Sequence, residues 1–356
     1  MSQTVEIASR PVGAGHPPYV VTELSANHLG SLERAFAVME ASKQAGADAI
    51  KLQTYTADTI TIDHDGPGFR IEGGLWDGRS LYELYEEAHT PWDWHAELFA
   101  KGRELDLTVF SSPFDATAVD FLERFDPPAY KIASFECIDL PLIARTAATG
   151  KPLIISTGMA DQSEIGDAVA AARQAGSGGV VLLHCVSAYP APADEANLRT
   201  IADLAGKFDL PVGLSDHTLG TAVSVAATTL GAAMIEKHLT LSRADGGPDA
   251  EFSLEPNELR KLVDDCRTAF SSLGQASYQR TSSETANAAF RRSLYVVADI
   301  EKGEPFTEAN VRSIRPGFGL PPKLLESVLG CRARCTLKRG APLDEDAVEW
   351  GAGRKP

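Results

Sequence analysis

Residues 211–240, PVGLSDHTLGTAVSVAATTLGAAMIEKHLT, contain two apolar runs on either side of a stretch with helical periodicity. The runs at 211–217 and 234–240 stay apolar until their last few residues, which is typical of strands buried on both faces of a parallel sheet. Residues 221–230 repeat apolar positions at helical spacing and stop at Gly231, a common helix end. The segment therefore predicts a strand, a helix and a second, parallel strand.

The same pattern recurs along most of the chain. Apolar, β-branched runs cover residues 19–24, 49–54, 108–113, 129–134, 152–158, 180–186, 211–217 and 234–240. Amphipathic stretches between them cover residues 32–45, 94–105, 116–125, 164–175, 197–208 and 221–230. Strict alternation of eight such strands with helices predicts a (β/α)8 TIM barrel. An open doubly wound sheet is the alternative, but no G-x-G-x-x-G motif follows any of the runs.

The pattern changes after the helical stretch at 256–273. Residues 274–288 are rich in Ser, Thr, Gln and Ala, and short β-like segments separated by Gly and Pro follow from Arg291 onward. We therefore predict a barrel domain at 1–275, a linker at 276–290 and a small, mostly β domain at 291–356. A domain this small buries little surface alone, so it should pack on the barrel or on a partner subunit. The long segment 58–91 is predicted to be a lid or binding loop.

Composition limits the function. The formal net charge of −16 argues against nucleic acid or an anionic membrane as a partner, because both require a basic surface. An anionic substrate would need a local cluster of cations. The five cysteines show no disulfide spacing, residues 1–18 lack the pattern of a signal peptide, and no apolar run is long enough to span a membrane. These features predict a cytoplasmic protein.

Polar side chains end each of the eight apolar runs, where TIM barrels place their active sites. Two lysines could supply charge and four serines could supply oriented donors, which predicts a pocket for a phosphate-bearing anion. These residues are Lys51, Lys131, Ser112, Ser134, Ser156 and Ser215.

A pair of histidines ends the last two runs. His217 and His238 could share a divalent metal ion through neutral imidazole nitrogens, or one could be catalytic and the other a hydrogen-bonded core residue. Glu236 could hold a hydroxyl group or a metal-bound water, and Glu23 could act as a general base. Strand alternation predicts that Lys237 points away from the barrel interior.

These motifs together resemble the sialic acid synthase family. The matching strings are TELSANHLG (22–30), KLQTY (51–55), SSPFD (111–115), KIAS (131–134), STGM (156–159), SDHT (215–218) and EKH (236–238). RRSLYVV (291–297) and RPGFGL (315–320) resemble the family's antifreeze-like (SAF) domain. Within the family, LYELYEEAHTPW (81–92), ASFE (133–136) and LSRADGGPDAEFSLEP (241–256) are most similar to the pseudaminic acid synthase branch.

The resemblance implies a condensation of phosphoenolpyruvate with the open-chain aldehyde of an N-acetylated sugar, with release of phosphate. For the pseudaminate branch that sugar is 2,4-diacetamido-2,4,6-trideoxy-L-altrose. N-acetylneuraminate and legionaminate synthases are alternatives with the same chemistry. The family reaction also implies a divalent metal ion, Mn²⁺ first and Mg²⁺ or Co²⁺ as alternatives, bound by the residues matching His217 and His238.

The resemblance also assigns roles to individual positions. Phosphoenolpyruvate would contact Lys51, Ser112, Lys131, Ser134, Ser156, Ser187 and Ser215, although sialate synthases carry Asn at the position of Ser187. The sugar would contact Gln53, Tyr189, Asp249 and Arg315. The catalytic residues would be Glu23, Glu236, His217 and His238, with Glu23 as the acid/base group. The family forms a domain-swapped homodimer, in which Arg315 would reach the site of the other subunit.

Two other functions compete with this interpretation. A Schiff-base aldolase would use Lys131 or Lys51 as a nucleophile and would need no metal. An inactive carbohydrate- or ice-binding protein would use the small domain as its functional module. Neither requires the serine-lined anion pocket together with paired histidines.

Overall fold

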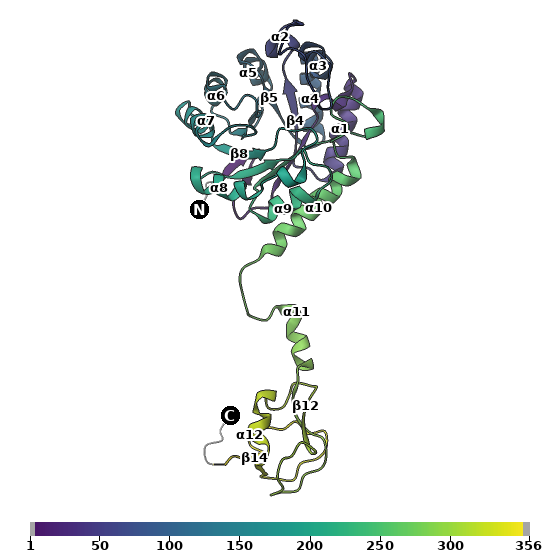
Figure 1. The fold of residues 1–356 in the computed structure, drawn as a ribbon, viewed down its shortest axis with the longest axis vertical. Coiled ribbons are helices and arrows are strands. Elements are labelled where there is room, and N and C mark those ends of the chain that lie inside the picture. The colour runs from purple at the N-terminus through teal and green to yellow at the C-terminus, as the bar shows by residue number, and fades with distance from the viewer. Residues whose placement is uncertain (1–3, 352–356) are drawn as a thin grey trace. The chain divides into compact units, whose positions relative to one another are not determined.

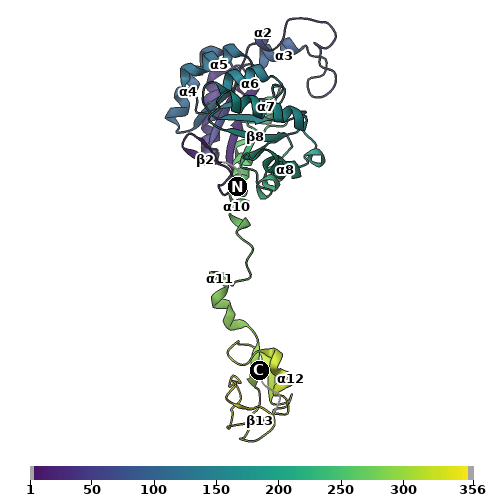
Figure 2. The same cartoon turned by 90° about the vertical axis from the view of Figure 1, so that its left-hand side faces the viewer.

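A closed barrel of parallel strands forms the larger part of the chain (Figures 1 and 2). The computed structural model describes residues 4–351. The barrel strands are β3 (Tyr19–Glu23), β4 (Ala49–Thr54), β5 (Thr108–Pro113), β6 (Tyr130–Ile132), β7 (Leu153–Ser156), β8 (Val180–Cys185), β9 (Val212–Ser215) and β10 (Met234–His238). They pair in chain order, and β10 closes the barrel against β3 with Met234 opposite Tyr19 and His238 opposite Glu23. The predicted TIM barrel is confirmed.

Helices surround the strands, as Figure 1 shows. They are α1 (Leu32–Ala45), α4 (His95–Glu104), α5 (Ala116–Leu122), α6 (Leu140–Ala147), α7 (Gln162–Gln174), α8 (Arg199–Phe208), α9 (Ala222–Thr229) and α10 (Pro256–Leu273). Two further helices, α2 (Ala57–Ile60) and α3 (Leu81–Ala88), lie in the long connection from β4 to α4. Side-chain caps begin several helices, since Ser31 accepts from Arg34 N at the start of α1 and Asp161 accepts from Glu164 N at the start of α7.

Apolar side chains fill the N-terminal half of the barrel. Tyr19, Ala49 and Met234, the first residues of their strands, belong to a buried cluster that also contains Phe110 and Val181. A short antiparallel hairpin, β1 (Val5–Ile7) and β2 (Arg10–Val12), adds Val5, Ile7 and Val12 to this cluster. The sequence did not predict this hairpin. Because this end is packed with apolar groups, polar groups are confined to the C-terminal ends of the strands.

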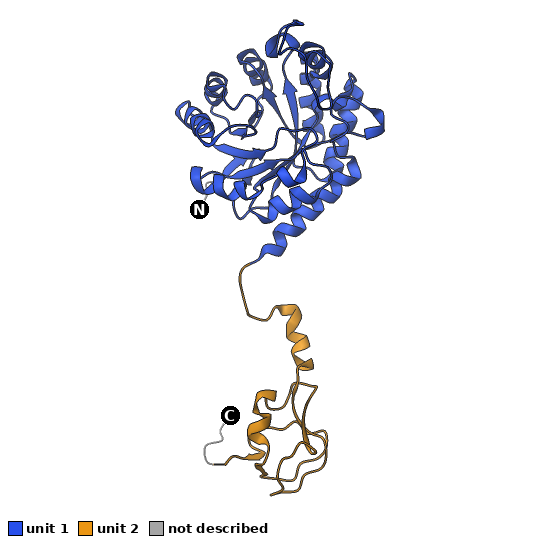
Figure 3. Ribbon diagram, viewed as in Figure 1, with its two compact units in different colours: residues 1–274 blue, residues 275–356 orange. Residues whose placement is uncertain are grey.

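The chain divides into two compact units, residues 1–274 and 275–356 (Figure 3). The second unit contains two small antiparallel sheets, β11 (Ser293–Val296) with β12 (Val311–Ile314) and β13 (Arg332–Ala333) with β14 (Val348–Glu349). Its own core includes Leu294, Phe306, Leu343 and Val348. Helix α12 (Leu325–Val328) also belongs to it, and α11 (Ser282–Thr285) followed by a 3₁₀ turn (Ala286–Phe290) occupies much of the predicted linker.

No helix among residues 4–351 is both long enough and apolar enough to span a lipid bilayer.

A buried histidine joins α4 to the barrel wall. His95 is fully buried, its Nδ1 donates to Pro91 O at 3.2 Å, and its Nε2 therefore accepts from Thr54 Oγ1 at 2.8 Å. Thr54 Oγ1 in turn accepts from Ser111 Oγ at 2.7 Å, which connects β4 with β5. Burial lowers the pKa of His95 to about 4, so the imidazole stays neutral in the folded protein at pH 7.

This burial predicts a loss of stability in mild acid. Between pH 6.5 and pH 4 the unfolded chain binds a proton on His95 that the folded chain excludes, so the free energy of unfolding falls as pH falls through this window. At pH 5 the contribution of His95 to this fall should be about 2 kcal/mol. Urea unfolding at pH 7 and pH 5 should show it in the wild type and not in His95→Gln, with His64→Gln as the surface control. Equal pH dependence in the wild type and His95→Gln would contradict the prediction.

Candidate active site

Four charged side chains meet inside the mouth of the barrel. Lys51 on β4 forms an ion pair with Glu23 on β3, and its Nζ lies 3.3 Å from Oε1 of Glu236 on β10. Lys131 on β6 approaches the same Oε1 at 3.4 Å, and Ser215 Oγ on β9 donates to it at 3.0 Å. All four charged side chains are at most 4% exposed. The structure thus brings together residues from opposite parts of the sequence, as the strand-end analysis predicted.

The surroundings of the two carboxyl groups differ. Burial raises the pKa of Glu23 and outweighs the opposing effect of Lys51. Burial also opposes ionisation of Glu236, but Lys131 and Lys51 outweigh it and hold the pKa of Glu236 below its usual range. Burial would lower the pKa of Lys51, and the two carboxylates raise it instead to about 12. The site therefore contains one fixed carboxylate and one carboxyl group able to exchange a proton near neutral pH, the usual arrangement of an acid/base pair.

Serine hydroxyls line the same end of the barrel. Ser112 Oγ on β5 and Ser156 Oγ on β7 are buried and have no hydrogen-bond partner among the described residues. Ser134 Oγ accepts from Gly158 N at 3.2 Å. A Cβ on Gly158 would lie 2.8 Å from Ser134 Oγ and closer still to Ser187 Oγ, so the missing side chain lets both serines approach the same point. Unpaired buried hydroxyls are costly unless a ligand satisfies them, which favours a binding role.

The two histidines lie side by side at the ends of β9 and β10. Their ring centroids are 5.4 Å apart. His217 Nδ1 donates to Val186 O at 3.1 Å, and His238 Nδ1 is buried without a hydrogen-bond partner among residues 4–351. Burial opposes the charged form of His217, but its contact with Cys185 outweighs this effect and raises the pKa of His217. Burial lowers the pKa of His238 well below its usual value, so its ring is neutral. Two imidazoles this close fit a shared divalent ion, which would bind both rings in their neutral form at metal–nitrogen distances of about 2.1 Å.

Other protein ligands for such an ion are few. Among residues 4–351 no group of three or more His, Cys, Asp or Glu side chains is placed to hold a metal ion. A metal bound here would have the two histidines as ligands and would take its remaining ligands from substrate or water. That open coordination is a feature of catalytic sites.

Aromatic rings and one carboxylate surround the histidines. The Tyr189 ring lies 4.5 Å from that of His217, and the Phe252 ring lies 4.9 Å from that of His238. Asp249 is buried, with Oδ2 4.0 Å from His238 Nδ1 and accepting from Ala26 N at 3.2 Å. Trp76, from the predicted lid, packs 5.5 Å from Tyr189. Sequence reasoning anticipated Tyr189 and Asp249 and missed Phe252 and the contact of Trp76.

Two further predicted sugar-binding residues lie in different places. Gln53 is half-buried near the end of β4, where it pairs in register with Ser112 on β5. Arg315 directly follows β12 in the second unit and is exposed there. Its predicted approach to a barrel site remains a prediction.

A second ion pair lies just outside the barrel wall. Lys237 points away from the interior, as predicted, and its Nζ lies 3.0 Å from Oδ2 of Asp216 with both side chains at most 1% exposed. Asp216 also accepts from Ser224 Oγ on α9 and from Thr218 N. The pair thus joins the residue before His217 to the residue before His238. Alternation along the strand predicted the direction of Lys237 but could not identify its partner.

The fold and site define a class of protein, a TIM-barrel enzyme for anionic substrates with a C-terminal SAF domain. Residues 38–278 match the NeuB family, and residues 291–349 match the SAF domain. The chain belongs to the NeuB family, which confirms the predicted resemblance to sialic acid synthases.

Sequence identity to this chain differs among individual members of the family. The chain is 44% identical to the pseudaminic acid synthase of Helicobacter pylori over 94% of its own length and 98% of that protein. It is 33% identical to the N,N'-diacetyllegionaminic acid synthase of Legionella pneumophila over 96% and 97% of the two chains. The crystal structure of N-acetylneuraminic acid synthetase from Leptospira borgpetersenii in complex with citrate superposes with a TM-score of 0.72 at 31% identity, covering 81% of this chain and 95% of the other.

The buried Lys237–Asp216 pair predicts a large effect on stability. Lys237→Met should lower the free energy of unfolding by about 3–5 kcal/mol, because it leaves Asp216 as a buried charge without its cation. Denaturant unfolding measures the change. Lys261→Met on α10, which breaks an exposed pair with Asp265, is the matched control and should have little effect. A loss no larger than that of the control would contradict the prediction.

Proposed function

We propose that this protein is a pseudaminic acid synthase that condenses phosphoenolpyruvate with 2,4-diacetamido-2,4,6-trideoxy-L-altrose and water to give pseudaminic acid and phosphate. The observation that carries the proposal is the juxtaposition of two buried lysines, unpartnered serine hydroxyls and a histidine pair in a NeuB-family barrel. The greater identity to a pseudaminic acid synthase than to a legionaminic acid synthase supports this choice of sugar.

Phosphoenolpyruvate would bind through charge and oriented donors. Lys51 and Lys131 supply two ammonium groups from β4 and β6, and both already contact Glu236, so the substrate would share these cations with the carboxylate. Ser112 and Ser156 supply hydroxyl donors that make no hydrogen bond within the described part of the chain. The remaining predicted contacts are Ser134, Ser187 and Ser215.

The histidine pair would hold a divalent metal ion, with Mn²⁺ as first choice and Mg²⁺ or Co²⁺ as alternatives. When bound, such an ion supplies Lewis-acid polarisation of an aldehyde oxygen. His217 is oriented for this by its Nδ1 bond to Val186 O, and Asp249 Oδ2 lies 4.0 Å from His238 Nδ1. Tyr189 and Gln53 would contact the sugar from the same face, and Arg315 of a partner subunit would complete the sugar site in a domain-swapped dimer.

In the reaction, C3 of phosphoenolpyruvate forms a bond to the aldehyde carbon, whose oxygen takes up a proton. Water then adds at C2 and loses a proton, which gives a C2 hydroxyl. This hydroxyl passes its proton to the departing phosphate as the bond between C2 and the phosphate oxygen breaks, and C2 becomes the ketone carbon. Glu23 is our candidate for these proton transfers, because its Oε1 is buried and has no hydrogen-bond partner among the residues that the structure describes. Glu236, held by two lysines and Ser215, would remain a carboxylate and stabilise positive charge that develops at C2.

The assay that tests the function measures phosphate release from phosphoenolpyruvate. The diacetamido-trideoxy-altrose, the corresponding legionaminate precursor and N-acetylmannosamine are offered in parallel, with Mn²⁺ and after chelation. The expected result is phosphate release only with the altrose sugar and only when the metal ion is present. Phosphate release with another of the sugars would change the proposed substrate and keep the proposed reaction. Phosphate release that persists after chelation would contradict the proposed requirement for a metal ion. Trapping of substrate on Lys131 or Lys51 by borohydride would instead support the Schiff-base aldolase.

Variants of two neighbouring serines can distinguish an effect on substrate binding from an effect on stability. Ser112→Ala should raise the KM for phosphoenolpyruvate about tenfold, because it removes a donor to a charged group, with little change in stability. The matched control is Ser111→Ala, which loses the hydrogen bond to Thr54 on the opposite face of β5 and should lower stability while leaving KM unchanged. Steady-state kinetics and thermal unfolding of both variants measure the two effects. An unchanged KM in Ser112→Ala would contradict the proposed contact.

The cytoplasmic location and the domain-swapped homodimer remain predictions. Sedimentation at micromolar concentration tests the dimer directly.

A further inference from the structure

The loop at residues 239–255, which joins β10 to α10, brings two side chains to the histidine pair. Asp249 Oδ2 lies 4.0 Å from His238 Nδ1, and the Phe252 ring packs on His238. The base of the loop is closed by backbone bonds from Thr240 N to Leu254 O and from Leu254 N to His238 O, each 2.9 Å long. Between these bonds, the loop contains one 3₁₀ turn at Arg243–Asp245 and no helix or barrel strand. Its conformation therefore depends on a few short turn bonds, such as Ser253 N to Ala250 O at 3.2 Å, and on side chains.

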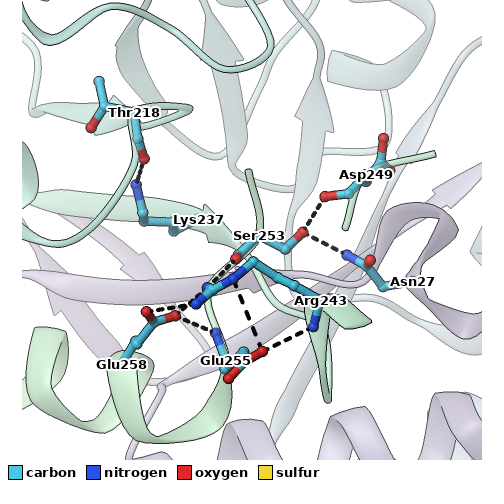
Figure 4. Close-up of polar contacts among 8 residues, drawn as sticks. All are labelled: Asn27, Thr218, Lys237, Arg243, Asp249, Ser253, Glu255 and Glu258. Carbon is cyan, nitrogen blue, oxygen red and sulfur yellow. Dashed lines mark hydrogen bonds and ion pairs between the residues drawn. The ribbon is translucent and has the colours of Figure 1, made fainter. Parts of the chain in front are cut away.

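Arg243 holds one side of this loop (Figure 4). Its guanidinium donates through Nη1 to Ser253 O at 3.1 Å and through both Nη atoms to the carboxylate of Glu258, in the first turn of α10. Its backbone N donates to Glu255 Oε1 at 2.9 Å. One arginine thus joins the start of the loop, its end and the helix that follows. The planar fork of the guanidinium makes several such bonds at once, which a lysine cannot do.

Ser253 links Arg243 to Asp249 through hydrogen bonds. Its carbonyl accepts from Arg243, while its hydroxyl donates to Asp249 O at 2.6 Å and accepts from Asn27 Nδ2 at 2.9 Å. Asn27 lies in the turn after β3, four residues beyond Glu23. Figure 4 shows these contacts as a continuous series from Glu258 through Arg243 and Ser253 to Asp249 and Asn27.

We propose that Arg243 is a positioning residue that fixes Asp249 and Phe252 against the histidine pair and so sets the affinity for the sugar substrate. The identity of that substrate rests on the proposed function. Arg243 acts through Ser253 and does not itself reach the histidines. Its side chain is 39% exposed and that of Glu258 38%, so the ion pair alone adds little to global stability. Its effect is local, on a loop that has few backbone bonds of its own.

Arg243→Met, which keeps much of the apolar stem and removes the donors, tests the proposal in the full-length protein. Hydrogen–deuterium exchange of the loop amides, including Ser253 N and Leu254 N, should become about tenfold faster, as expected for loss of a charged hydrogen bond. The KM for the sugar should rise about tenfold while the KM for phosphoenolpyruvate and the melting temperature change little. Arg243→Lys should restore only part of the protection.

The matched control is Arg260→Met on α10, whose guanidinium donates to Gln44 O away from the loop. It should change neither loop exchange nor either KM. Unchanged loop exchange in Arg243→Met, or an equal rise in both KM values, would overturn the proposal. Because exchange is measured without substrate, it tests the role of Arg243 even if the wild-type enzyme releases no phosphate with any sugar.

Discussion

The rest of the site depends on one constraint, the need to neutralise four charges buried in the barrel mouth. Removing Glu23, Lys51, Lys131 and Glu236 from water is costly, and the cost is offset only when opposite charges meet at close range. The pairing of β10 with β3 supplies that proximity, because it places Glu236 beside the side chains of β3 and β4. An incoming anionic substrate must then share lysines that are already paired, so binding and rearrangement of the carboxyl groups are coupled.

The division of the barrel into an apolar half and a polar half supports this arrangement. The cluster that includes Tyr19, Met234 and Ile7 of the β1–β2 hairpin seals one end with side chains that have no hydrogen-bonding groups to satisfy, apart from the tyrosine hydroxyl. Water and substrate can therefore approach the charges only from the end where the strands finish. The Lys237–Asp216 pair braces the outer side of that end, between β9, β10 and α9. Both histidines thus extend from strands that are fixed on two sides.

The sequence predicted the barrel and most of the site because both depend on local signals. Apolar runs that end in Lys, Glu, Ser or His mark strands whose polar ends meet at one edge of a parallel barrel. The β1–β2 hairpin gave no such signal, since each strand has three residues and is stabilised by contacts with distant strands. The partners of Lys237 and Arg243 could not be predicted from the sequence either. A sequence pattern indicates the direction in which a side chain points, but it does not identify the residue that the side chain contacts on another strand or in an irregular loop.

The aromatic residues around the histidine pair come from loops, not from barrel strands. The lysines and histidines lie on β-strands or directly after them and suit a reaction common to the synthesis of several sugar acids. The aromatic rings of Trp76, Tyr189 and Phe252 come instead from the loops that connect strands to helices. Trp76, from the long segment between β4 and α4, donates through Nε1 to Pro248 O at 2.9 Å and packs against Tyr189. The two long loops therefore contact each other, and Arg243 holds the 239–255 loop through its bond to Ser253 O. Discrimination between sugar isomers should reside in this pair of loops, because they can vary without disturbing the buried charges on which the chemistry depends.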